Sequence, residues 1–428
     1  MELATRKSSA SVVNLDSLPD HLTSGSRVNF SNSICVDVVL GASALLGLEA
    51  QWNAIIASNS NPSPFSSWNW IKNWIEIFGA DQNIVTLVCR NGQEVVGIVP
   101  FAWKQGIFPL SMRKLCMIAS QTIISDKGLT EEPVFAIKSQ PQIRELVLSA
   151  THSKLKQMLF SGPWDCIAYR RLGQGIEGCS LLEMKKDSLV TQRYSRGCEF
   201  VHISYSWEEY LGSLSNSTNR KISYFRTKFQ RANIHLTVED ILVEETEAII
   251  KTLVNFHKMC IRLEPNGEEV DSFNDPRQVA LLVHALKDMI PIGEAKIVVL
   301  KANDQIIAVQ VFLKSGSMLV AHHSGFDPQW TKFRPVFVLQ SYVIQGAIRE
   351  GIKTLSFIRG NTFRQETWGA KSHNQIIDIT IAKRSLFPRI RQTINVPDMS
   401  LIGAFSSLKV VKRTKAASQL SRTKSRND

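Results

Sequence analysis

The chain has 428 residues, of which 44% are hydrophobic and 21% are charged, and its formal net charge is +12. That length predicts two domains, because a single hydrophobic core rarely serves more than about 250–300 residues. No apolar run in the sequence approaches the roughly 18 residues of a membrane-spanning helix, and the first residues lack the apolar stretch of a secretory signal. The composition therefore predicts a cytoplasmic globular protein whose positive charge suits an acidic or phosphate-rich ligand.

The first part of the chain predicts helices followed by a β-hairpin. Residues 1–34 are rich in Ser and Asn and are expected to be disordered. Apolar residues at helical spacing then predict a helix over 68–78, whose apolar face consists of Ile71, Trp74, Ile75 and Phe78. An Asn-Gly pair, whose residues tolerate positive φ, joins two predicted strands at 84–90 and 94–103.

The hairpin pattern recurs later in the chain. Residues 87–101 (LVCRNGQEVVGIVPF) can be aligned with residues 298–312 (VVLKANDQIIAVQVF) with one gap. This weak internal repeat predicts two lobes, each built around a related hairpin. We therefore expect an N-terminal lobe over 35–190, a C-terminal lobe over 195–385 and a basic tail over 386–428.

The second lobe is predicted to contain helices, then a meander of strands, then a strand–helix–strand unit. Its expected helices cover 216–232, 244–261, 277–289 and 335–350, and its expected strands cover 297–301, 306–313, 318–323 and 354–358. This order is typical of a mixed α/β (α+β) fold, in which helices pack on mixed sheets.

The end of the chain is strongly basic. Residues 401–428 contain seven Lys or Arg residues and a single acid, Asp428. One interpretation is a solvated tail. The other is a short amphipathic helix, carrying Phe405, Leu408 and Val411, that makes weak contact with an anionic membrane surface. No specific nucleic-acid partner is expected.

Common site motifs are incomplete or missing from the sequence. Residues 173–178 fit GxGxxG, but they lie mid-chain without flanking βαβ units, so a Gly-rich loop is the better interpretation. The sequence has no HExxH, P-loop or GxSxG motif, and its seven cysteines lack metal-ligand spacing. We therefore expect no metal cofactor, and zinc-hydrolase, nucleotidase and serine-esterase chemistries are disfavoured.

A candidate anion site lies at the start of the helix predicted over 335–350. Lys332 and Arg334 come just before Pro335, a residue that suits the first position of a helix. Free backbone N–H groups and the helix dipole favour phosphate at such a position. The alternative is that both side chains are ordinary surface charges.

Histidines offer further candidates. His257 shares an apolar stripe with Leu253, which leaves open both a core role and a role as catalytic base. His322 and His323 are adjacent on a predicted strand, so we expect them to face opposite sides of the sheet and not to chelate a ligand jointly.

Taken in order, these segments resemble the CelD-like acetyltransferases, a family of the GNAT superfamily associated with bacterial cellulose and exopolysaccharide synthesis. The resemblance covers residues 35–385 approximately, and the order and spacing of several motifs carry it. These motifs are Ser67-Trp68 through Phe78-Gly79, RNGQEVVGIVPF, Phe256-His257, NDQIIAVQVF, SGFDP at 324–328, and the segment from Ala347 through Gly360 to Trp368.

The resemblance implies two tandem GNAT-like lobes related to those of Fem-type transferases, with acyl-CoA (acetyl-CoA) bound in the second lobe as co-substrate. An amine or hydroxyl of a saccharide-type or small acceptor would attack the thioester directly, while a general base takes its proton. The residues implied to hold the CoA phosphates are Lys332, Arg334, Pro335 and Val336. Those implied to line the acceptor cleft are Arg359, Asn361 and Trp368, and the candidate bases are Glu366, His257 and Asp327.

Several positions depart from the family pattern. Val336 stands where the family has a Gly that would let phosphate approach the backbone. Ser356, Asn361 and Thr362 stand where the family has acidic residues, which removes the obvious bases. Two other functions therefore stay open: a non-catalytic binding or scaffold member of a polysaccharide-synthesis system, and a Fem-like transferase that uses aminoacyl-tRNA.

Overall fold

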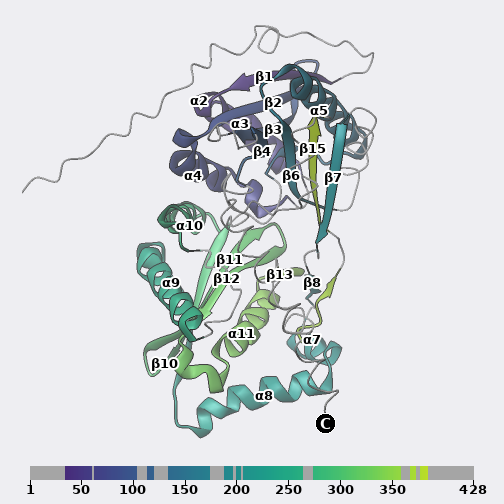
Figure 1. The fold of residues 1–428 in the computed structure, drawn as a ribbon. Coiled ribbons are helices and arrows are strands. Elements are labelled where there is room, and N and C mark those ends of the chain that lie inside the picture. Colours follow the sequence, from purple (N-terminus) through teal and green to yellow (C-terminus); the bar gives the residue numbers. More distant parts are fainter. Residues whose placement is uncertain are drawn as a thin grey trace, which may run out of the picture.

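The computed structural model places the chain in two lobes, one above the other in Figure 1. The residues that it describes are 34–59, 62–103, 113–119, 134–173, 188–195, 199–203, 206–263, 273–357, 367–372 and 376–383. Each lobe has a mixed β-sheet with helices on both faces, which confirms the predicted mixed α/β fold.

The sheet of the N-terminal lobe has the strand order β1-β2-β3-β4-β6-β15-β7, and β5 pairs with β3. Neighbouring strands are antiparallel except β4 and β6, which are parallel. The strands are β1 Cys35–Leu40, β2 Asn83–Asn91, β3 Glu94–Trp103, β4 Lys114–Met117, β5 Ala136–Ile137, β6 Cys166–Gly173, β7 Ser188–Ser195 and β15 Ile376–Lys383. One face packs on α5 (Pro141–Ser161), and the other on α2 (Ala42–Leu46), α3 (Glu49–Ala57) and α4 (Trp68–Phe78).

The second sheet has the order β14-β8-β13-β12-β11-β10-β9. Only β12 and β13 are parallel among its described pairs. The strands are β8 Glu199–His202, β9 Leu236–Asp240, β10 Ala295–Ala302, β11 Gln305–Ser315, β12 Met318–Phe326, β13 Thr354–Phe357 and β14 Lys371–Ser372. One face packs on α7 (Trp207–Ser213), α8 (Asn216–Arg231) and α11 (Pro335–Arg349), and the other on α9 (Thr246–Leu263) and α10 (Pro276–Met289).

The two sheets follow the same plan. In each, a hairpin (β2–β3 and β10–β11) leads into a strand that is followed by a helix and then by a parallel neighbour, β4–α5–β6 and β12–α11–β13. Both hairpins carry a bulge near the turn, between Cys89 and Arg90 and between Leu300 and Lys301. The predicted hairpin repeat and tandem architecture are therefore confirmed.

The last described strand does not belong to the lobe in which the sequence placed it. β15 pairs with β6 on one side and β7 on the other, both in the first sheet. Its alternating Ile379 and Ile381 are fully buried in the core beneath α5, which gives the apolar reason for this long-range pairing. For this strand the expected C-terminal lobe boundary of 195–385 is wrong. The predicted disordered segment 1–34 and basic tail 386–428 lie outside the described residues, except for Ile34, which is buried in the N-terminal lobe.

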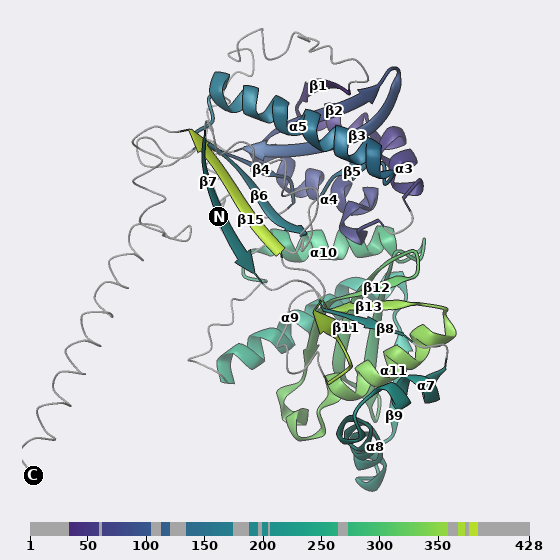
Figure 2. The ribbon, with the colours of Figure 1, turned by 90° about the vertical axis from the view of Figure 1, so that its right-hand side faces the viewer.

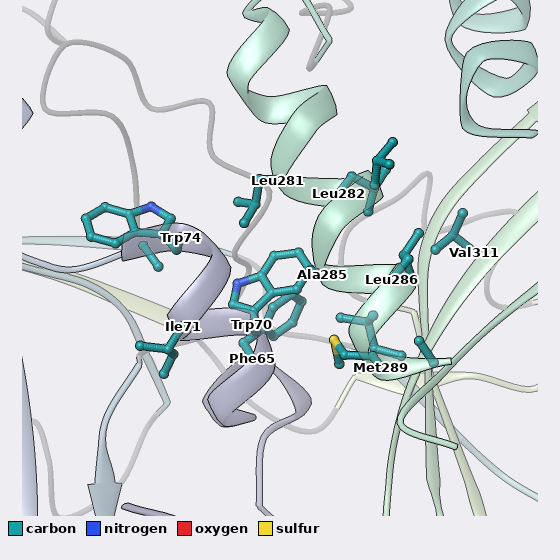
Figure 3. Packing of buried hydrophobic residues seen from close by; sticks show 14 of the residues in the cluster. Phe65, Trp70, Ile71, Trp74, Leu281, Leu282, Ala285, Leu286, Met289 and Val311 are labelled. Atoms are coloured by element: carbon teal, nitrogen blue, oxygen red, sulfur yellow. The ribbon is translucent and has the colours of Figure 1, made fainter. Parts of the chain in front are cut away.

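The lobes share one continuous hydrophobic core, formed where α4 packs on α10. Figure 3 shows Trp70 and Phe65 of the N-terminal lobe meeting Leu281, Ala285 and Leu286 of α10, and all are buried. Figure 2 shows α10 lying between the two sheets. α4 and α10 are equivalent elements, since each precedes the hairpin of its own lobe. α4 therefore helps to hold the lobes together through Trp70, a residue outside the apolar face predicted for 68–78.

Polar contacts flank this apolar seam. Ser67 Oγ donates to Glu294 Oε2 at 2.5 Å, and Asn73 Nδ2 donates to Asp288 Oδ2 at 2.8 Å. At the edge, Arg277 pairs with Asp81 at 3.0 Å, and both side chains are largely exposed. An exposed pair of this kind contributes about 0.2–1 kcal/mol, whereas burying one large apolar side chain contributes roughly 1.5–3 kcal/mol, so the apolar packing dominates the interface.

β12 approaches α9 closely at Gly325. A Cβ atom there would lie 2.7 Å from Leu253 Cδ1. We expect Gly325→Ala to destabilise the protein by about 1–3 kcal/mol, because the overpacked core must shift. Gly346→Ala is the matched control, since Gly346 lies in α11 and a Cβ atom added there would meet nothing within 4 Å. Urea denaturation should show the control to be neutral or slightly stabilised, and equal effects of the two substitutions would contradict the prediction.

Candidate functional site

The start of α11 offers backbone donors. The 3₁₀ helix Pro328–Phe333 leads into it, and Arg334 between them has a left-handed backbone with φ of 52°. The first hydrogen bond of α11 runs from Val338 N to Arg334 O at 3.1 Å. Pro335 has no N–H, so the N–H groups of Val336 and Phe337 are the ones left without a carbonyl partner inside the helix. A helix start of this kind favours an anion.

Three cationic side chains surround this helix start. Lys332 and Arg334, the two cations proposed from the sequence, are exposed. Lys228 of α8 joins them, because its Nζ donates to the carbonyl of Lys332 at 2.7 Å. The Arg334 guanidinium lies 5.2 Å from the ring centroid of Phe225, and the Lys228 ammonium lies 5.2 Å from that of Phe333. Cation–π contacts therefore hold the charges near the helix start.

Lys228 was not singled out from the sequence. The signal that could have found it is the composition of α8, which carries five basic residues and no acid: Arg220, Lys221, Arg226, Lys228 and Arg231. Arg226 fixes this helix on α11, since its Nε donates to Ser341 Oγ at 2.9 Å and its guanidinium lies 4.0 Å from the ring centroid of Tyr342. Burial lowers the pKa of Arg226.

The donor set at the start of α11 fits a phosphate group. The side chain of Val336, which stands where Gly was expected, is half-buried and packs on the apolar cluster beneath α11. The equivalent helix of the first lobe, α5, differs. Its N-cap is Gln140, and the nearby Lys138 is paired with Glu94. Among the described residues, several cations therefore gather at the start of α11 in the second lobe but not at the start of α5 in the first.

A bulge interrupts β12 just beyond its described pairing with the parallel strand β13. Their described pairing joins Met318–Ala321 to Thr354–Phe357, and β12 then continues to Phe326. Opposite β11, the register shifts so that Ala321 faces Phe312 and His323 faces Val311, which leaves His322 as the extra residue. In parallel α/β units, ligands bind beyond the carboxyl ends of the strands, and this bulge and the start of α11 both lie at that end.

The bulge overturns the expectation that His322 and His323 face opposite sides. An extra residue breaks the alternation of the strand, and the ring centroids of the two histidines lie 4.3 Å apart. The ring of His323 also lies 6.4 Å from that of His257 on α9 and 4.9 Å from that of Phe273. Burial lowers the pKa of His323 well below its usual value, and the neighbouring His322 and His257 lower it further.

The remaining candidates divide between structural positions and segments outside the described residues. Asp327 is buried, and its side chain caps the 3₁₀ helix by accepting a hydrogen bond from Gln329 N at 3.0 Å. Trp368 is buried against Phe337 on the α11 face, while the partner lobe lies on the other face of the sheet. Glu366, Arg359 and Asn361 lie outside the described residues.

The described part of the chain shows neither a metal centre nor a membrane-spanning helix. No group of three His, Cys, Asp or Glu side chains there is placed to bind a metal ion. None of the described helices is long and apolar enough to span a membrane.

Comparison with known proteins gives one family match. Residues 216–366, which run from α8 past β13, match the family model described as an acetyltransferase (GNAT) domain. No curated protein matches the chain.

Solved structures extend the comparison to both lobes. The crystal structure of FemX matches with a TM-score of 0.54 and 12% identity, over 81% of this chain and 98% of FemX. A conserved protein of unknown function from Bacteroides thetaiotaomicron VPI-5482 matches with a TM-score of 0.49 and 9% identity, over 78% of this chain and 97% of its own. A tandem GNAT protein from the clavulanic acid biosynthesis pathway matches with a TM-score of 0.43 and 9% identity, over 82% and 99%.

The likeness to FemX concerns the fold alone, since identity is low, and it spans both lobes. The family match falls on the lobe that carries the cationic helix start and the histidine bulge. The chain therefore has two similarly built lobes, and residues 216–366 of the second lobe match an acetyltransferase (GNAT) domain.

Proposed function

We propose that this protein is an acyl-CoA-dependent acyltransferase, most simply an acetyltransferase, that acylates an amine or hydroxyl of a saccharide-type or other small acceptor. The observation that carries the proposal is the gathering of Lys228, Lys332 and Arg334 at the open start of α11, inside the GNAT domain. The CelD-like resemblance supports the choice of a saccharide acceptor and a role in polysaccharide synthesis. A weak membrane contact through the basic tail belongs to the same proposal.

The proposed donor site needs phosphate binding and a route for the acyl group. Backbone N–H groups of Val336 and Phe337 and the three cations would hold the CoA phosphates. CoA supplies an activated thioester when bound. The acyl chain would lie beside β12 at the same end of the sheet, where the acceptor attacks directly.

Isothermal titration calorimetry with acetyl-CoA and a longer acyl-CoA tests the donor site. We expect binding that Lys332→Ala/Arg334→Ala weakens at least about tenfold, which is about 1.4 kcal/mol. Arg334→Gly isolates the side chain, because Gly accepts the left-handed backbone of residue 334 without strain. Affinity should also fall as salt is raised, since the cations are exposed.

Arg144→Ala on α5 is the matched control, because Arg144 lies near the start of the equivalent helix in the first lobe and packs over Phe135. It should bind acyl-CoA as the wild type does. If no acyl-CoA binds to the wild-type protein, the proposed function is wrong. Binding without release of CoA in the presence of any acceptor would favour a non-catalytic binding protein.

A further inference from the structure

The three histidines near the bulge of β12 form a cluster that the donor site does not use. Among the described residues, His323 touches the rings of His322, His257 and Phe273, and its Nε2 is buried without a hydrogen-bond partner. A buried polar atom of this kind is costly, and its position calls for an explanation. A ligand group arriving beside β12 would supply the missing partner.

The elements around His323 fix its ring from several sides. His322 packs at 5.4 Å on both Phe65 and Trp70, so the N-terminal lobe holds the extra residue of the bulge in place. His257 approaches from α9, and Phe273 approaches from the turn before α10. The imidazole of His323 thus lies on β12 close to the contact between the lobes, at the end of the sheet that carries the proposed donor site.

We propose that His323 is the general base of acyl transfer and that its Nε2 accepts the proton of the acceptor, while His322 and His257 position its ring. This proposal rests on the proposed function. The sequence offers no carboxylate at Ser356, where the family resemblance places an acid. An imidazole is the side chain best suited to take over that proton transfer near neutral pH. The lowered pKa keeps His323 in its neutral, proton-accepting form.

The proposed step conserves atoms and charge. The nitrogen or oxygen of the acceptor attacks the thioester carbonyl carbon, and a new C–N or C–O bond forms as the C–S bond breaks. The electron pair of that bond leaves with sulfur. The proton of the acceptor passes to His323 Nε2 and then to the sulfur, which yields free CoA thiol and restores the neutral imidazole.

Placement of His323 can be tested by NMR of protein labelled with ¹⁵N-histidine, titrated with acetyl-CoA after calorimetry has shown binding. We expect the Nε2 resonance of His323, assigned with His323→Gln, to shift. The resonance of His152, buried in the N-terminal lobe, should stay in place. Binding without a shift at His323 overturns this proposal and leaves the proposed function standing. No binding overturns both.

The role of His323 is tested by release of CoA from acetyl-CoA into water, followed with a thiol reagent. His323→Gln should slow release about a hundredfold, while calorimetry shows an affinity for acetyl-CoA within about threefold of the wild type. His284→Gln, at an exposed position on α10, should leave both unchanged. A slower rate at unchanged affinity supports the proposal, because loss of a merely structural residue would not separate rate from affinity. An undiminished rate in His323→Gln overturns it. If the wild type releases no CoA, the resonance alone decides.

Discussion

Trp70→Ala is expected to destabilise the protein by about 3–5 kcal/mol, the loss usual for deleting a fully buried Trp side chain. Trp70 is 0% exposed, and its ring lies 5.4 Å from those of Phe65 and His322. The substitution leaves a cavity in the one core that both lobes share (Figure 3). Urea denaturation followed by circular dichroism measures the loss.

The same substitution should act across the lobe boundary. Because Trp70 packs on His322, hydrogen exchange of the β12 amides should become faster in Trp70→Ala. Trp164→Ala is the matched control, since Trp164 is equally buried but belongs to the core cluster under α5, within the N-terminal lobe. It should lose similar stability and leave exchange in β12 unchanged. Equal exchange in β12 for both variants would contradict the shared core.

Elements with a strong local pattern were predictable from the sequence. α4 carries apolar residues at helical spacing, and the hairpin of β2 and β3 has an Asn-Gly turn between two apolar strands, so their observed bounds match the predictions closely. The repeat of that hairpin in β10 and β11 also identified the tandem plan. In each case the information lies within about a dozen neighbouring residues.

Features that depend on distant pairing were not predictable in this way. β15 has the pattern of any short apolar strand, and nothing local indicates that its partners are β6 and β7 rather than a strand of the second sheet. The bulge at His322 likewise depends on the register with β11, and one extra residue reverses which side a ring faces. Lys228 reaches the site only because α8 lies across α11.

The candidate site shows the same division. Lys332 and Arg334 could be proposed from the sequence because a cation before a helix-starting Pro is a local pattern. The side chain of Asp327 caps a 3₁₀ helix and Trp368 lies in the core, which sequence spacing alone does not indicate. His257 stays a candidate both for a core residue and for a site residue, and its ring lies against those of His323 and Phe273 near the contact between the lobes.

Acid should destabilise the N-terminal lobe through His152. This side chain is 5% exposed on α5, with its ring 5.7 Å from that of Tyr169, and burial lowers its pKa from 6.5 to about 4. The unfolded chain takes up a proton near pH 6.5, while the folded protein does so only near pH 4, so acid favours the unfolded state. The stability present above pH 6.5 is therefore lost as the pH falls towards 4, by about 3 kcal/mol.

Chemical denaturation at a series of pH values from 7 to 4 checks this expectation by comparing slopes. His152→Leu keeps an apolar side chain of similar size but cannot titrate, so its free energy of unfolding should fall by about 3 kcal/mol less over that range than that of the wild type. The contribution of His323, whose pKa is also lowered, is common to both proteins and cancels. His284→Leu, at an exposed position, should follow the wild-type slope. Parallel curves for His152→Leu and the wild type would show that the folded protein accommodates a charged His152, which a sealed apolar core beneath α5 does not permit.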